Sequence, residues 1–277
     1  MSYGELVEEG RPHRPALRRP PGPPENGAGA ARCRCGPQPA KRRRLHHAAP
    51  DGRPERPLRP EAGELLGQGA DPKLASDSGA TPLYAVLNVQ WSAKALLYPQ
   101  PTAHLHQKLR YLDLMKALLD KGADPNARLT KHLWYASYNF DLLAVNTAGA
   151  TPFWRAAYGT DVPAMKLLIK YGADPKIPTL KPAGRMRGED ADEEDDGKKD
   201  PSGLPEIPVG GPGVYPIHAA SGVGYGEGYA ANAHRHAPGG WMPAVKYLIE
   251  ELGADVNARD HNGYNAIHHA AARGATR

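Results

Sequence analysis

The chain has 277 residues, of which 40% are hydrophobic, which is enough apolar material for one large or two small packed domains. It carries no run of about 18 apolar residues, so no transmembrane helix is expected. Its two cysteines, Cys33 and Cys35, are separated by a single residue, which excludes a disulfide framework across the rest of the chain.

Residues 1–60 differ in composition from the remainder, with 12 Arg and 12 Pro but few large aliphatic side chains. Such a stretch cannot bury enough apolar surface to offset the entropy of ordering, so we expect a disordered tail before a folded domain at residues 61–277. The N-terminal letters MSYGELVEEG lack the basic start and apolar middle of a signal peptide, and the sequence leaves the compartment open. It also leaves open whether the tail is genuine or a spurious upstream extension.

Charge follows the same division of the chain. The tail has 13 basic and 6 acidic residues, a net charge of +7, whereas the remainder has 22 and 24, a net charge of −2. The basic pI of 9.1 therefore belongs to the tail, and the folded part is not expected to bind nucleic acid. The run KRRR at Lys41 to Arg44 has three interpretations: a nuclear localisation signal, a polyanion or nucleic-acid tether, and a solvated basic stretch.

A first motif, Gly-Ala-Asp, recurs four times in the predicted folded part. Each copy follows an apolar run with the three- and four-residue spacing of one helix face, such as Leu114, Leu118 and Leu119. We expect each glycine to end its helix, because only glycine enters the left-handed conformation at little cost. The four glycines are Gly69, Gly122, Gly172 and Gly253.

A second motif follows ten residues after Gly69 and again ten after Gly253. It reads GATPLYA from Gly79, GATPFWRAA from Gly149, GVYPIHAA from Gly213 and GYNAIHHAA from Gly263. In the first two copies, Thr81 and Thr151 are placed to cap a helix that begins with Pro82 and Pro152. Small residues then allow close approach of neighbouring helices. The predicted unit is a turn, a short helix and a longer helix.

At this point the sequence resembles the ankyrin repeat family, whose TPLHxA and GADxN signatures match TPLYA, PIHAA, GADPN and GADVN. The resemblance covers about residues 61–277, and the long insertions are similar to those of multi-repeat bacterial ankyrin proteins. It implies an all-α solenoid of helix-turn-helix repeats, and a structural hydrogen bond for His218 and His268. The motif residues that carry it are Thr81, Pro82, Gly122, Asp124, Thr151, Pro152, Gly172, Asp174, His218, Gly253, Asp255 and His268.

The spacing departs from a regular array in several places, since Gly79 and Gly122 are 43 residues apart where Gly149 and Gly172 are 23 apart. Terminal units of an array need a polar outer face, which neither end supplies, so exposed apolar rows are expected near Leu65 and Leu66 and near Ile267. We interpret the chain as a fragment of a longer array. Units are predicted at about 61–75, 76–127, 147–177, 211–259 and 260–277, with insertions at about 89–108, 128–146, 178–210 and 222–241.

Motifs for catalysis or metal binding are weak. The pairs His104/His106 and His234/His236 have ligand spacing, but they lie in insertions that offer no closed ligand shell. The chain has no GxSxG motif, and the glycine-rich stretch from Gly222 follows a helix instead of a strand. The acidic run at residues 189–200 is typical of a solvated loop. No enzyme activity, cofactor, small-molecule substrate or resident metal is therefore predicted.

Aromatic residues in the insertions are the strongest candidates for binding, because aromatics dominate interface hot spots. They can equally form a small core under the loops, and both interpretations stay open. We predict a non-catalytic scaffold that binds a protein or peptide; the alternatives are a metal protein using His234 and His236, and the basic tether. The predicted contact residues are Trp134, Tyr135, Tyr138, Trp154, Arg155, Tyr158, Tyr225, Tyr229 and Trp241.

Overall fold

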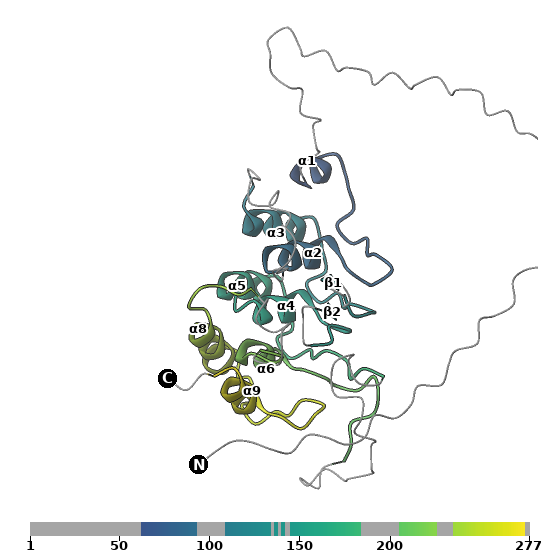
Figure 1. Cartoon of the computed structure of the whole chain (residues 1–277). Coiled ribbons are helices and arrows are strands. Elements are labelled where there is room, and N and C mark those ends of the chain that lie inside the picture. Colours follow the sequence, from purple (N-terminus) through teal and green to yellow (C-terminus); the bar gives the residue numbers. More distant parts are fainter. Residues whose placement is uncertain are drawn as a thin grey trace, which may run out of the picture. The chain divides into compact units, whose positions relative to one another are not determined.

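The computed structural model describes residues 62–92, 109–133, 136–137, 140–141, 145–183, 205–225 and 235–274 (Figure 1). The chain divides into a unit at residues 1–57 and a compact unit at residues 58–277, to which all described residues belong. The predictions for the tail and its KRRR run lie outside the described residues.

The described fold is built almost entirely from short helices. Its single described sheet is a two-stranded antiparallel hairpin of β1 (Ala136–Ser137) and β2 (Phe140–Asp141). None of the described helices has the length and apolar character needed to cross a membrane. The helices are α1 (Ala62–Gly67), α2 (Pro82–Gln90), α3 (Tyr111–Asp120), α4 (Pro152–Tyr158), α5 (Val162–Lys170), α6 (Pro216–Ser221), α8 (Trp241–Lys246), the π-helix η2 (Tyr247–Glu251) and α9 (Ala266–Ala272).

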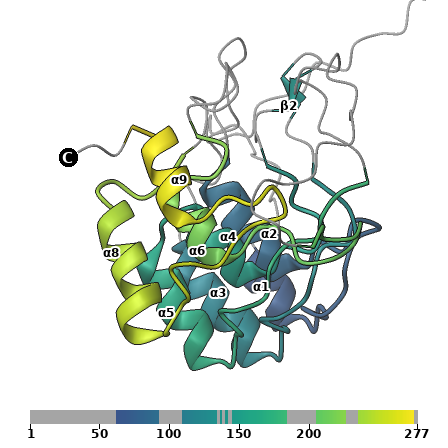
Figure 2. The same ribbon diagram turned by 90° about the horizontal axis from the view of Figure 1, so that it is seen from below.

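The helices of this unit stand in two ranks (Figures 1 and 2). In the first rank α2 packs on α4, α4 on α6, and α6 on α9, while in the second rank α1 packs on α3 and α3 on α5. The ranks are joined pairwise, α2 with α3, α4 with α5 and α6 with α8. Each helical pair therefore completes its core against the pairs before and after it.

The caps and turns expected from the motifs are present. The hydroxyl oxygen of Thr81 accepts from the Tyr84 amide, and that of Thr151 accepts from the Trp154 amide, at the starts of α2 and α4. After the second-rank helices the chain turns at left-handed glycines, with φ of 90° at Gly122 and 87° at Gly172. Glycine is needed there because a Cβ would be strained at this φ.

The first-rank helices carry buried alanines, whose small side chains allow neighbouring helices to approach closely. Ala156 and Ala157 of α4 and Ala219 and Ala220 of α6 are fully buried. The larger side chain of Phe153 is also fully buried and belongs to the same core cluster.

The two ends of the described stack leave apolar side chains open, as the sequence predicts for Leu65 and Ile267, whose side chains are 46% and 73% exposed. The prediction was wrong for Leu66, which is 8% exposed and belongs to the core cluster. Helix α1 packs on α3, so one of the two adjacent leucines faces inward and the other outward.

Candidate partner-binding surface

Four connections leave the stack on one side, and we call them the fingers: residues 76–80, 129–150, 179–214 and 260–264. Each finger is closed at its base by two backbone hydrogen bonds. In one, the amide of the first residue donates to the carbonyl of the last residue. In the other, the amide of the glycine just before the last residue donates to the carbonyl of the first residue. The closing pairs are Ser76 N to Ala80 O and Gly79 N to Ser76 O; Leu129 N to Ala150 O and Gly149 N to Leu129 O; Thr179 N to Val214 O and Gly213 N to Thr179 O; Asp260 N to Tyr264 O and Gly263 N to Asp260 O.

The finger at residues 260–264 is organised around the buried carboxylate of Asp260. One oxygen accepts from the amides of Asn262 and Tyr264, both at 2.9 Å, and the other lies 2.8 Å from Nε2 of His269 on α9. Burial alone would raise the pKa of Asp260, but the hydrogen bonds from His269 and the Tyr264 amide outweigh it and hold the pKa below its usual range. The fixed turn presents Tyr264, half of whose surface is exposed (50%).

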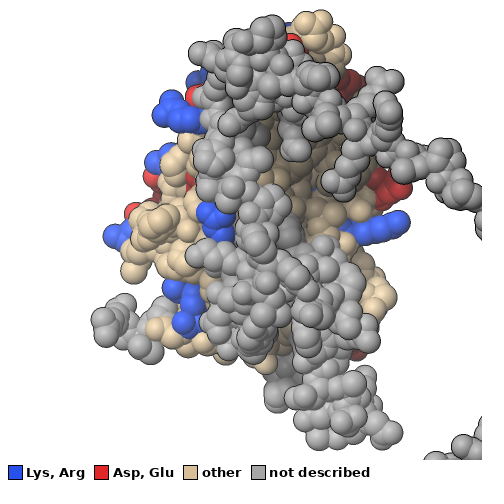
Figure 3. Space-filling view, turned by 45° about the horizontal axis from the view of Figure 1, so that its top comes forward, with Lys and Arg blue, Asp and Glu red and all other residues tan. Residues whose placement is uncertain are grey.

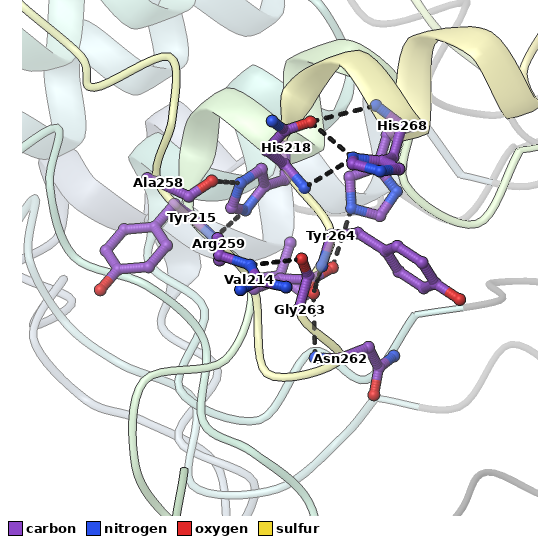
Figure 4. Close-up of polar contacts among 12 residues, drawn as sticks. Val214, Tyr215, His218, Ala258, Arg259, Asn262, Gly263, Tyr264 and His268 are labelled. Atoms are coloured by element: carbon purple, nitrogen blue, oxygen red, sulfur yellow. Dashed lines mark hydrogen bonds and ion pairs between the residues drawn. The ribbon is translucent and has the colours of Figure 1, made fainter. Parts of the chain in front are cut away.

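A buried side chain on each of two first-rank helices bonds to a main-chain carbonyl far along the chain, 40 residues later for His218 and 60 residues later for Trp154. His218 of α6 donates from Nε2 to the carbonyl of Ala258 at 2.9 Å, and its Nδ1 accepts from the Tyr215 amide (Figure 4). Accepting at Nδ1 requires the neutral ring with its proton on Nε2, and burial lowers the pKa of His218 accordingly. One unit earlier Trp154 does the same work, donating from Nε1 to the Val214 carbonyl at 2.9 Å.

An arginine braces two of the fingers along the backbone. Arg259 Nε donates to the carbonyl of Gly263 at 2.7 Å, and Arg128 Nε donates to that of Gly149 at 3.0 Å. Arg128 also reaches the residue just before the next finger, because its Nη2 lies 2.8 Å from the carbonyl of Pro178. The fingers are thus held to the stack and to each other.

The finger at residues 129–150 extends beyond its base as the β1–β2 hairpin, which the figures place away from the helices (Figures 1 and 2). His132 and Thr147 join its two sides through the Thr147 amide to Nδ1 and the Leu133 amide to the Thr147 hydroxyl, both at 3.0 Å. The predicted contact residues Trp134 and Tyr135 precede β1 in the sequence, and Tyr138 lies between the strands. The side chains of these three residues lie outside the described part.

Three predicted contact residues require correction. Trp154, Arg155 and Tyr158 are all at most 1% exposed, so they are core residues of α4 and not a surface for a partner. Trp154 stacks on Tyr158 with ring centroids 5.1 Å apart. Arg155 donates from Nε to Asn88 and from Nη2 to the Trp91 carbonyl, which joins α4 to the unit before it.

The ends of the glycine-rich insertion meet in an aromatic cluster against α4 and α8. Tyr225 and Trp241, both half-buried, pack edge to face at 4.8 Å, and the Arg273 guanidinium lies 3.9 Å from the centre of the Trp241 ring. Burial raises the pKa of Tyr225, against the charges of Arg155 and Arg273. The predicted contact residues Tyr225 and Trp241 thus pack against each other with at least one face of each ring. Tyr229, the third predicted contact residue of this insertion, lies outside the described residues.

Metal-binding residues do not gather in the described part of the chain, where no three His, Cys, Asp or Glu side chains form a group suited to an ion. The histidines of the metal alternative, His104, His106 and His234, lie outside it, and His236 packs on Trp241 at 4.7 Å between ring centroids. Sequence reasoning missed Asp260 and Tyr264. The signal was present in DHNGY, since an aspartate three residues before glycine is typical of a tight turn.

The comparisons with known proteins agree with the repeated geometry. A family model described as ankyrin repeats, in many copies, matches residues 232–277, which include α8, η2, the last finger and α9. No match is found among curated proteins. In this stretch the chain is similar to ankyrin repeats, and the repeated helix pairs, caps and finger bases of the other units agree with that similarity.

Proposed function

We propose that the protein is a non-catalytic scaffold that binds a partner protein or peptide through its fingers and the adjoining faces of the first-rank helices. Ankyrin repeats generally mediate protein–protein interaction, and this chain shares their motifs. We further infer that the units predicted at about 76–127, 147–177 and 211–259 stack as an α-solenoid, which is supported by the packing of α2 on α4 and α4 on α6.

The observation that carries this proposal is the common base of the fingers. All four close with the same pair of backbone hydrogen bonds, although one contains 5 residues and another, from 179 to 214, contains 36. A fixed base under variable loops is the arrangement by which a rigid framework presents specific contacts. A longer finger thus presents different residues to a partner, while the hydrogen-bonded base that holds it stays the same.

The proposed contact residues are the aromatics of two fingers, Trp134, Tyr135 and Tyr138 in one and Tyr264 in another. Tyrosine and tryptophan supply large contact areas with few rotatable bonds and a polar edge, which suits them to the centre of an interface. On the face drawn in Figure 3, Lys and Arg are interspersed with Asp and Glu and with uncharged areas over the described residues. Contacts by shape and aromatic burial therefore fit this surface better than attraction to a single sign of charge.

Affinity capture from cell lysate tests the proposal, with the full chain as bait. A quadruple variant, Trp134→Ala, Tyr135→Ala, Tyr138→Ala and Tyr264→Ala, is expected to lose the captured proteins. The control is Met242→Ala, a change on α8 at a side chain that is also well exposed (62%) but lies away from the fingers. Capture of the same proteins by the quadruple variant and the wild type would contradict the proposed surface.

A further inference from the structure

The first unit has an open apolar groove. It lies between α1, α2 and the start of α3 and is lined mainly by apolar atoms, with contributions from Ala62, Ala85, Val86, Val89 and Leu112. On α2 the side chains of Ala85 and Val89 are exposed, Val89 by 47%. Contiguous apolar surface of this kind on a helix that otherwise faces the core needs an explanation.

Comparison with the later units shows which element is missing from the groove. Counting from the threonine cap, Ala85 and Val86 correspond to Arg155 and Ala156 of α4, which are fully buried where α2 packs on α4. The second-rank helix α1 lies beside α3, but no described first-rank helix accompanies it. The groove is therefore the place that a first-rank helix occupies in every later unit.

The opposite end of the stack has the matching half of this interface. Helix α9 turns Ala266 and His269 toward α6, where they are buried, and leaves Ile267 and His268 on its other side. The counterparts of Ile267 in the earlier first-rank helices are Leu83, Phe153 and Ile217, which are all at most 3% exposed. Ile267 is 73% exposed.

We propose that two copies of the chain associate head to tail, with α9 of one copy seated in the groove of the other. Helix α9 would then lie on α2 as α2 lies on α4, α4 on α6 and α6 on α9 within one chain. The contact repeats an interface that the molecule already makes three times, and it covers Ile267 and Val89 together. Because it joins two different surfaces, it is heterologous and can add further copies.

The test is sedimentation velocity of the full chain over a range of concentrations. We expect mass to rise with concentration in the wild type and association to weaken by about tenfold or more in Ile267→Asp and in Val89→Asp, since a buried unpaired carboxylate costs more than the ~1.4 kcal/mol that tenfold represents. Both positions are exposed in the single chain, so each variant keeps its fold, which circular dichroism checks. Met242→Asp, an equal change on α8, is the control and should associate like the wild type.

A mixture of the two variants separates this proposal from other modes of association. Ile267→Asp keeps a sound groove and Val89→Asp keeps a sound α9, so an equal mixture should form dimers and nothing larger. A mixture that stays monomeric, or single variants that associate like the wild type, would overturn the head-to-tail contact.

One rival occupant of the groove comes from the sequence. The letters LHHAAPDG at residues 45–52 repeat IHHAAARG at residues 267–274 at five of eight positions, including HHAA and the final glycine. If that segment fills the groove, the wild type stays monomeric at every concentration, and hydrogen exchange of residues 82–90 quickens in Leu45→Asp. This result would overturn the proposal.

Discussion

The indole Nε1 of Trp91 donates a hydrogen bond of 2.9 Å to the carboxylate of Asp161, a residue 70 positions further along the chain. The hydroxyl of Tyr111 donates to the same oxygen at 2.9 Å, and the other carboxylate oxygen caps α5 by accepting from the Ala164 amide at 3.0 Å. Burial and the neighbouring carboxylate both raise the pKa of Tyr111, so its hydroxyl stays a donor. One side chain thus joins both helices of one unit to the start of a second-rank helix in the next.

Asp161→Ala should lower the free energy of unfolding by about 2–4 kcal/mol, because it removes a helix cap and leaves two donors without an acceptor. Urea unfolding followed by circular dichroism measures this loss. Asp161→Asn is the matched control, since its amide oxygen still accepts, and we expect about half the effect. Equal losses in the two variants would show that the charge matters and that the cap does not.

The neutral ring of His218 makes stability depend on pH. Burial lowers its pKa in the folded chain, so the unfolded chain binds more protons between that value and about 6.5, the usual pKa of histidine. Stability is therefore complete above about pH 7 and falls as the pH drops through this window. The charges of Asp260 and His269 act on the same ring in opposite directions, the first raising and the second lowering its pKa.

The measurement is the free energy of unfolding of the wild type and His218→Gln at several pH values from about 7 to 5. The variant should be weaker at pH 7 but should lose less stability on acidification. Parallel curves for the two proteins would mean that another group, such as His236, whose pKa burial also lowers, carries the dependence.

Two glycines near the start of the stack, Gly69 and Gly79, should respond differently to alanine. Gly69 and Gly79 both have left-handed backbone, with φ of 93° and 77°, but a Cβ on Gly69 would meet nothing within 4 Å. A Cβ on Gly79 would lie 2.7 Å from the backbone nitrogen of Thr130 in the next finger. We expect Gly69→Ala to cost about 1 kcal/mol of unfolding free energy for its backbone alone, and Gly79→Ala to cost clearly more. Similar costs, measured by urea unfolding, would contradict the close approach of the two fingers.

Arg155→Ala should behave as a core substitution. It empties a fully buried site and removes the bonds to Asn88 and Trp91, so a loss of about 3 kcal/mol in unfolding free energy is expected. Tyr264→Ala, at the exposed finger, should change that free energy by less than about 0.5 kcal/mol. A larger loss of unfolding free energy for Tyr264→Ala than for Arg155→Ala, measured by urea unfolding, would contradict the assignment of Arg155 to the core and Tyr264 to the surface.

Local sequence rules were enough for the repeated parts of this fold. The caps at Thr81 and Thr151 and the left-handed turns at Gly122 and Gly172 depend on neighbours only a few residues away, and their residue types fit few other conformations. The ankyrin resemblance then ordered these elements along the chain.

The functions of Trp154 and Asp161 could not be predicted in the same way. Trp154 stands where α6 has His218, and its indole makes the corresponding bond to a carbonyl 60 residues away. Its aromatic type alone suggested a surface contact, because burial is decided by units distant in sequence. The same holds for Asp161, whose partners Trp91 and Tyr111 lie 70 and 50 residues earlier in the chain.

The closing bonds at the finger bases have a consequence for how such a protein can change. Since Leu129 and Ala150 meet through their main chains, the meeting needs no particular side chain at either position. New segments can be inserted between such points while the helices keep their places. The binding surface can therefore change without any change in the sequence of the helices.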